Sequence, residues 1–177
     1  MFKQLGIREL RQHIRALSEK EREDLICHLY KKSNEASLLL EQLFLGPEAN
    51  ETIVREFDQK LEKMYRRIRS FEFKNAKKLF RETKKVVTDV TLLAEINLSF
   101  AYYATVFTYD YGDMYEDFYD TTAKAFIAAM NEAERNPNFA RKHQKRFRDI
   151  YEMANWMAWG FGEVVVEEFA RVDWDNI

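Results

Sequence analysis

Hydrophobic residues recur every three or four positions along most of the chain, which is the spacing of one face of an α-helix. Near the N-terminus, for example, these positions are Ile7, Leu10, Ile14 and Leu17. Polar breaks divide the pattern into segments, so we expect an all-α fold of about eight or nine helices. The expected helices span residues 7–17, 19–32, 35–45, 49–69, 76–87, 90–109, 114–135, 138–158 and 161–172.

Capping and helix-breaking residues mark the ends of these segments. Ser18 followed by Glu21 is a capping box, in which the two residues satisfy each other's free backbone N–H groups. Gly46 and Pro47 should end the helix 35–45, because glycine accepts a left-handed conformation and proline cannot continue the backbone hydrogen bonds. The expected N-cap residues are Ser18, Asn75, Asp89 and Asp113.

Segment 90–109 is apolar on both sides of its predicted helix, so we expect this helix to be buried between layers. The links between the later helices are short, which implies antiparallel hairpins in a short stack similar to helical repeats. Residues 1–46 are interpreted as an arm of short helices and residues 47–177 as the main domain; one continuous domain, 1–177, is the alternative. The arm is too short to bury its apolar face alone, which favours self-association.

Composition limits the class of protein. Hydrophobic residues make up 46% of the 177 residues and the formal net charge is −2, so bulk charge predicts neither a nucleic-acid nor a membrane partner. A single cysteine forms no intrachain disulfide, no apolar stretch is long enough to cross a membrane, and the charged N-terminus is unlike a signal peptide. We therefore expect a cytoplasmic protein.

Basic residues are concentrated in two segments. Residues 60–85 carry eleven Lys or Arg against three Glu, and residues 141–148 carry five with no acid. Basic helices can line a phosphate backbone, so nucleic-acid binding through 60–85 is one alternative function. Solvated helix faces and charge pairing with the acidic C-terminal half would explain the same residues.

The segment 100–120 combines aromatic rings with carboxylates. Nine of its residues are aromatic and five are Asp or Glu, without a Lys or Arg. Acids at a helix start act as caps, but spare carboxylates also suit a hard cation or a basic partner. The segment 155–162 places two tryptophans on one helix face beside two glycines. It is either part of the core packed around a helix kink or the aromatic wall of a binding pocket. The candidate binding surface consists of Tyr109, Asp110, Asp113, Glu116, Asp117, Trp156 and Trp159.

The sequence holds no complete catalytic or metal-binding pattern. None of the three histidines has a Glu three residues before it, as di-iron bundles require, and one cysteine does not suit a zinc site. Cys27 adjoins His28, but neighbouring helical residues point about 100° apart, so adjacency does not make a catalytic pair. We expect no cofactor, no metal and no enzymatic activity.

Several short motifs run through the chain: Leu10–Glu21, Leu25–Lys32, Ala76–Lys78, Tyr109–Asp113 before Phe118 and Tyr119, and Trp159–Gly162. Together they resemble a bacterial family known as domain of unknown function number sixty-one fifty-five. The resemblance covers nearly the whole chain and implies an all-helical bacterial protein. It implies no activity, cofactor or catalytic residue.

These observations predict a non-enzymatic protein–protein interaction or scaffold module, with a protein partner or a second copy of the chain. Two alternatives stay open. One is a nucleic-acid-binding protein that uses the basic helices at 60–85. The other is a small-molecule or cation-binding protein with its site at the turn 109–117.

Overall fold

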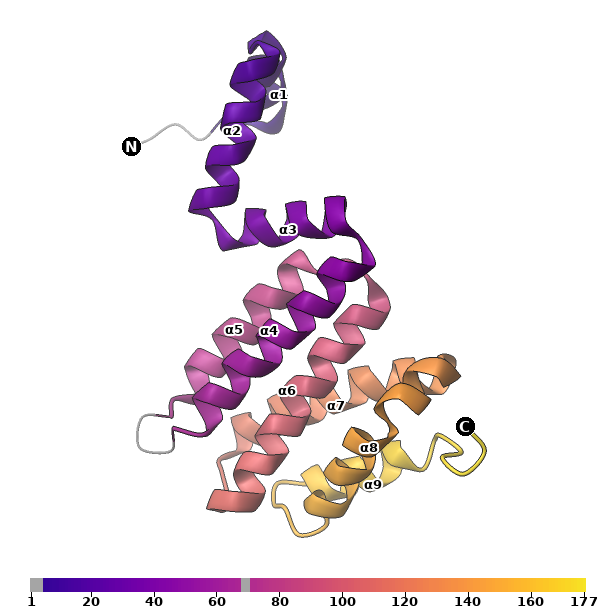
Figure 1. Ribbon diagram of the computed structural model, residues 1–177. Helices are drawn as coiled ribbons and strands as arrows, with labels where there is room; N and C mark the ends of the chain where they lie inside the picture. The colour runs from indigo at the N-terminus through magenta and orange to yellow at the C-terminus, as the bar shows by residue number, and fades with distance from the viewer. Residues whose placement is uncertain (1–4, 68–70) are drawn as a thin grey trace. The chain divides into compact units, whose positions relative to one another are not determined.

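The computed structural model describes residues 5–67 and 71–177 (Figure 1). The described residues contain nine α-helices and no strand, so the predicted all-α, multi-helix class is confirmed. The chain divides into two compact units, Met1–Gly46 and Pro47–Ile177. The division falls at the same residue as the predicted domain boundary; independent folding of the two parts stays a prediction.

Unit 1 consists of α1 (Ile7–Ala16), α2 (Glu19–Lys32) and α3 (Asn34–Leu45). The predicted capping box is present at the start of α2, where Ser18 Oγ accepts from the Glu21 N–H and the Glu21 carboxylate accepts from the Ser18 N–H. The Tyr30 hydroxyl of α2 donates to Glu41 Oε1 of α3 at 2.8 Å. As predicted, α3 ends at Gly46, which has a φ of 57°.

Unit 1 has almost no core. None of the residues between 5 and 46 whose side chains the structure describes is buried. Large apolar side chains are strongly exposed on all three helices, among them Ile7 by 72%, Leu43 by 74% and Phe44 by 74%. The helices of unit 1 are therefore set by local signals more than by tertiary packing.

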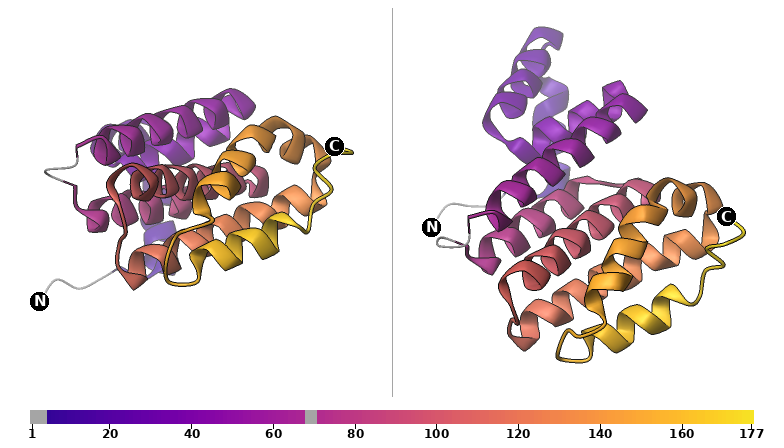
Figure 2. Two further views of the ribbon diagram at one scale, coloured as in Figure 1. Left: turned by 90° about the horizontal axis from the view of Figure 1, so that it is seen from below. Right: turned by 60° about the horizontal axis from the view of Figure 1, so that its bottom comes forward.

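Unit 2 consists of α4 (Pro47–Tyr65), α5 (Phe73–Val86), α6 (Val90–Tyr111), α7 (Glu116–Arg135), α8 (Pro137–Ala154) and α9 (Phe161–Phe169). Helix α6 lies between the α4–α5 pair on one side and α7 and α8 on the other (Figures 1 and 2). The predicted neighbours α5–α6 and α7–α8 do contact each other, but α6 packs more extensively on α7 than on α5.

Helix α6 carries the core of unit 2, as its two apolar sides predicted. Ile96, Leu98 and Phe100 are fully buried, and the Phe100 ring stacks on Phe80 of α5 with centroids 4.2 Å apart. Among the described residues, α6 is also the one helix with the length and hydropathy of a membrane span, and 61% of that window is buried inside the protein. Core helices of globular proteins commonly pass the same test.

Two predicted N-caps are wrong. Asn75 lies inside α5, which begins at Phe73, and its side-chain amide donates to Glu72 instead. Asp113 lies before the start of α7, where Tyr115 is the N-cap and makes no side-chain capping bond. In both places an aromatic anchor packed in the core, Phe73 or Phe118, decides where the helix starts, because its burial outweighs one capping bond.

The predicted N-cap at Asp89 is confirmed, since its carboxylate accepts a hydrogen bond from the Leu92 N–H at 2.7 Å. Two helix ends differ from the predicted ones. The helix expected at 49–69 ends at Tyr65, and residues 68–70 lie outside the described part of the chain. The helix expected at 138–158 ends at Ala154, and a turn with a left-handed Gly160 separates it from α9.

Candidate functional site

The structure brings the two predicted candidate segments together at one end of unit 2. The ring of Tyr109, near the end of α6, lies 6.4 Å from the ring of Trp156, just after α8. The indole Nε1–H of Trp159 donates to the backbone carbonyl of Met114, in the α6–α7 link, at 3.1 Å. Residues more than 40 positions apart in the sequence therefore form one surface.

The backbone between α8 and α9 has the geometry that this meeting requires. Trp159 has a φ of 58° and Gly160 a φ of 70°, so two successive residues are left-handed. This conformation is unfavourable for a tryptophan, and the Trp159–Met114 hydrogen bond offsets part of its cost. The close approach of the start of α9 to the end of α8 depends on Gly162 and not on Gly160, because a Cβ at Gly162 would lie 2.7 Å from the Ala154 carbonyl oxygen.

The aromatic rings at this end of unit 2 stay accessible to solvent. Tyr109 is 55% exposed, Trp156 52% and Trp159 59%. The Tyr109 and Trp156 rings contact each other, and Trp159 is bonded to the neighbouring α6–α7 link. Burial of a large aromatic ring is favourable, so these exposed rings are suited to a partner. We call Tyr109, Trp156 and Trp159 the aromatic surface.

The predicted carboxylates do not converge beside the aromatic surface. Asp113 accepts a hydrogen bond from the Tyr119 hydroxyl, and burial together with this bond raises the pKa of Tyr119 to about 12. Asp117 pairs with Lys77 of α5 at 2.9 Å. Asp110 lines a different hollow, of about 430 Å³, which α4 and α6 share.

The carboxylates are dispersed among separate partners. In the described residues, no three His, Cys, Asp or Glu side chains are grouped closely enough to hold a metal ion. Glu116 and Asp117 lie in the first turn of α7, where negative charge is favoured by the helix dipole. Segments 100–123 and 149–170 contain ten Asp or Glu and no Lys or Arg. Four of these acids, Asp117, Asp120, Asp149 and Glu168, pair with cations from outside the two segments.

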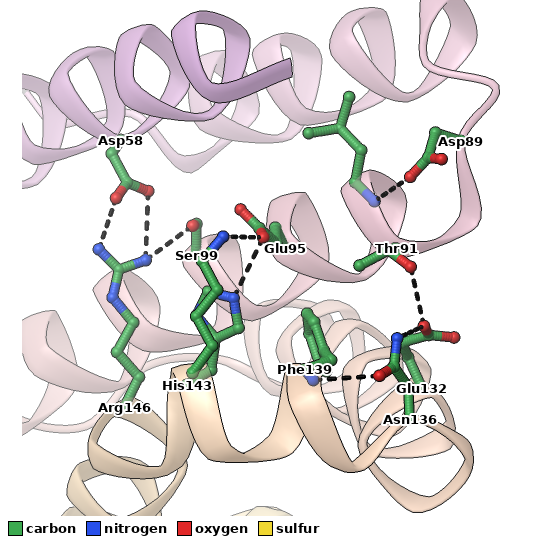
Figure 3. A network of polar contacts seen from close by, with 12 residues as sticks. Asp58, Asp89, Thr91, Glu95, Ser99, Glu132, Asn136, Phe139, His143 and Arg146 are labelled. Carbon is green, nitrogen blue, oxygen red and sulfur yellow. Dashed lines mark hydrogen bonds and ion pairs between the residues drawn. The ribbon is translucent and has the colours of Figure 1, made fainter. Parts of the chain in front are cut away.

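A second polar region was not found from the sequence. It is a groove of about 440 Å³ between α4, α6 and α8, lined by Arg55, Asp58, Glu95, Tyr103, His143 and Arg146 among others. Figure 3 shows Asp58, Glu95, His143 and Arg146. Its centre is Glu95, whose side chain is 12% exposed and lies 2.6 Å from Lys142 Nζ and 3.2 Å from His143 Nε2. The His143 contact is an ion pair only when the imidazole is protonated, and its angles do not make it a hydrogen bond.

The charges in this groove are largely neutralised by one another. Burial would raise the pKa of Glu95, but the neighbouring His143 and Lys142 outweigh burial and hold it below its ordinary value. Arg146 donates to both Asp58 oxygens, at 2.5 and 3.5 Å, and to Ser99 Oγ at 2.9 Å. These contacts join three helices, so the groove is best explained as a structural polar network.

One sequence signal could have revealed the network. Glu95 is the one charged residue between Val90 and Tyr109, and a lone carboxylate on a buried helix requires a basic partner. That partner comes from the segment 141–148, whose cations instead suggested nucleic acid. Lys142 and Arg146 pair within the groove, Lys145 pairs with Asp149 and Arg148 with Asp175.

The basic helices at 60–85 are also partly neutralised within unit 2. Lys60 pairs with Glu56, Arg66 with Glu62, and Lys77 with Asp117. Lys84 donates to Asn97 Oδ1 at 3.0 Å and lies over the Phe80 ring, and burial lowers its pKa. Of these ion pairs, Lys77–Asp117 joins the basic N-terminal half of the chain to the acidic C-terminal half.

Comparisons with known proteins found no relatives: no family model, no curated protein and no solved structure matches the chain. The resemblance to a bacterial family of unknown function, which depends on short motifs, therefore stays a prediction. Function has to be argued from the surfaces themselves.

Proposed function

We propose that this protein is a non-enzymatic helical interaction module that binds an arginine-rich segment of a partner protein at the aromatic surface. The proposal rests on one observation: half-exposed Tyr109 of α6 and Trp156 of the turn after α8 converge at a ring distance of 6.4 Å. Exposed apolar patches of this kind commonly mark interaction sites.

The charge around the aromatic surface supports a basic partner. No Lys or Arg occurs in the two segments that build it, 100–123 and 149–170. An arginine guanidinium can stack on the face of a tryptophan or tyrosine ring. Lysine offers a point charge without the planar stacking face, so arginine should bind more tightly.

The test is a titration of the full chain with three peptides of equal length, rich in arginine, lysine or glutamate. Tryptophan fluorescence reports directly, because two of the three tryptophans are Trp156 and Trp159. We expect micromolar binding of the arginine peptide, weaker binding of the lysine peptide and none of the glutamate peptide. The double variant Tyr109→Ser, Trp156→Ser should weaken binding at least about tenfold, which is about 1.4 kcal/mol.

The matched control is Val90→Ser. Val90 is 66% exposed and lies at the opposite end of the same helix from Tyr109, so its replacement should leave the affinity unchanged. Equal affinity of the double variant and the wild type would remove the aromatic surface from the proposal. Failure of the wild type to bind either basic peptide at low salt would contradict the proposed partner.

A second candidate function has one observation in its favour. A hollow of about 330 Å³ between α4 and α5 is lined by Lys60, Lys63 and Arg67 beside the Phe71 ring. Cations next to a ring suit a phosphate backbone with an unpaired base. This alternative predicts binding of single-stranded nucleic acid that falls steeply with salt. Loss of that binding in Lys63→Glu, and not in Tyr109→Ser, would separate it from the first proposal.

A further inference from the structure

An apolar groove between α2 and α3 is the main feature of unit 1. It measures about 310 Å³ and is lined by Ile26, Cys27 and Tyr30 from α2 and by Leu40, Phe44 and Leu45 from α3. Four of these side chains are 44–74% exposed. This groove is separate from the aromatic surface of unit 2, so an inference about it does not depend on the proposed function.

The arm, residues 1–46, does not bury the apolar side chains of this groove by itself. No side chain described between residues 5 and 46 is buried. Isolated helices of this length are marginal in water, and segments of about 40 residues are stable only with disulfides, metals or association. The single cysteine excludes an internal disulfide, and no metal cluster exists among the described residues. Association with a second copy would bury this apolar surface and stabilise the arm.

The charges along α2 are complementary to those of a second α2 in the opposite direction. The first six residues, Glu19–Asp24, carry four acids against Lys20 and Arg22, a balance of −2, while the last two are Lys31 and Lys32, a balance of +2. Antiparallel pairing of two copies sets each acidic half against a basic end, whereas parallel pairing sets like charges together. A two-fold interface requires this kind of self-complementarity.

We infer that a second copy of this chain covers the α2–α3 groove, with the two α2 helices antiparallel and Cys27 close to the two-fold axis. The exposed area is adequate. Eight large apolar side chains of α2 and α3 are 38–74% exposed, and four of them, Ile26, Tyr30, Phe44 and Leu45, line the groove. An interface that covers all eight would bury about 600 Å² per copy if a fully exposed side chain presents about 150 Å². Two copies would bury about 1,200 Å², the lower end of the range for stable interfaces.

Light scattering of the full chain tests the dimer. We expect a dimer at micromolar concentration, and Ile26→Glu and Phe44→Glu should each raise the dissociation constant at least about tenfold, because each places a charge inside the apolar interface. Val90→Glu, an exposed apolar position of unit 2, is the control and should stay dimeric. A wild-type monomer at near-millimolar concentration would overturn the inference, as would a dimer that both groove variants leave intact.

Charge reversal tests the antiparallel direction and leaves every apolar side chain of the groove in place; of the reversed residues, Lys31 borders the groove. Glu19→Lys with Glu23→Lys makes both ends of α2 basic, and Lys31→Glu with Lys32→Glu makes both ends acidic. Each double variant should dimerise at least about fivefold more weakly than the wild type, and an equimolar mixture of the two should regain a heterodimer. Double variants that dimerise as tightly as the wild type would exclude this arrangement.

The chain's one cysteine reports the location of the interface. Axes of packed helices are about 8–10 Å apart, so a short bis-maleimide should join Cys27 of one copy to Cys27 of the other. We expect the cross-linked product from the wild type and its loss in Ile26→Glu, with equal cysteine labelling in both. Absence of the product from a dimeric wild type would show that the copies meet elsewhere.

Discussion

The two units differ in what holds their helices. In unit 2, side chains from every helix enter the core, and Leu61, Phe100 and Phe126 have no solvent exposure. In unit 1, α2 has a complete capping box and a regular apolar face but no buried residue. Local signals are therefore as good in unit 1 as in unit 2, and the units differ in tertiary burial.

This difference shows which part of the chain is available for association. Helix caps and dipole effects contribute about 1 kcal/mol each, while burial of one large apolar side chain contributes about 1.5–3 kcal/mol. Unit 2 uses most of its apolar surface internally and leaves a few aromatic rings at one end. Unit 1 leaves nearly all of its apolar surface open, so any covering partner changes its stability more than that of unit 2.

The largest expected contrast comes from removing a large apolar side chain in each unit. Phe100→Ala deletes a fully buried ring stacked on Phe80 and should lower the free energy of unfolding by about 3–5 kcal/mol. Leu43→Ala removes a side chain that is 74% exposed and should change it by less than about 0.5 kcal/mol. Urea unfolding of dilute protein measures both, and similar losses would contradict the contrast.

Polar contacts should give the next largest difference. Asp58→Ala leaves Arg146, whose side chain is 29% exposed, without its carboxylate partner, so we expect a loss of about 2–3 kcal/mol. Glu41→Ala breaks the solvent-accessible bond from Tyr30 in unit 1 and should cost less than about 0.5 kcal/mol. Thermal unfolding of the two variants measures both losses. Equal losses would contradict the predicted difference between the two units.

Alanine substitutions at two glycines, Gly162 in unit 2 and Gly6 in unit 1, compare how tightly the backbone is packed in each unit. At Gly162 an added Cβ would lie 2.7 Å from the Ala154 carbonyl oxygen, and at Gly6 it would meet only the flexible Glu9 carboxylate at 3.8 Å. Gly162→Ala should therefore destabilise unit 2 by about 2 kcal/mol, and Gly6→Ala should have an effect of a few tenths of a kcal/mol. Chemical unfolding decides between these values, and a neutral Gly162→Ala would mean that α9 shifts freely against α8.

The smallest expected effect depends on pH. His143 and Lys142 hold the pKa of Glu95 below its ordinary value of 4.5, so this carboxylate stabilises the folded state above pH 4.5 and loses the contribution as the pH falls below it. Glu95→Gln should cost about 1 kcal/mol at neutral pH and less in acid. Unfolding curves over pH measure this, and Glu21→Gln, a fully exposed site, should leave the pH dependence of unit 2 unchanged.

The sequence predicted most of the helices because their signals are local. The spacing of Leu93, Ile96 and Phe100 and the cap at Asp89 depend on residues within a turn or two of each other. The caps at Asn75 and Asp113 failed because buried Phe73 and Phe118 moved the helix starts. For the candidate site, the sequence grouped Tyr109 with Trp156 as a hypothesis based on aromatic density. The 6.4 Å ring contact itself came from the structure, since helical periodicity carries no information about contacts 47 positions apart.

By itself the sequence determined the all-α class, the buried position of α6 and the open apolar face of residues 1–46. Helical periodicity and capping depend only on residues close together in the sequence. Only the tertiary structure decided how the charges and rings are used. It dispersed the carboxylates around Gly112 among separate partners, and it directed Lys142 and Arg146 inward to Glu95 and Asp58. It also left Tyr109, Trp156 and Trp159 exposed on one surface. The physical reason is that ion pairs and ring contacts depend on the packing of whole helices, which local sequence does not specify.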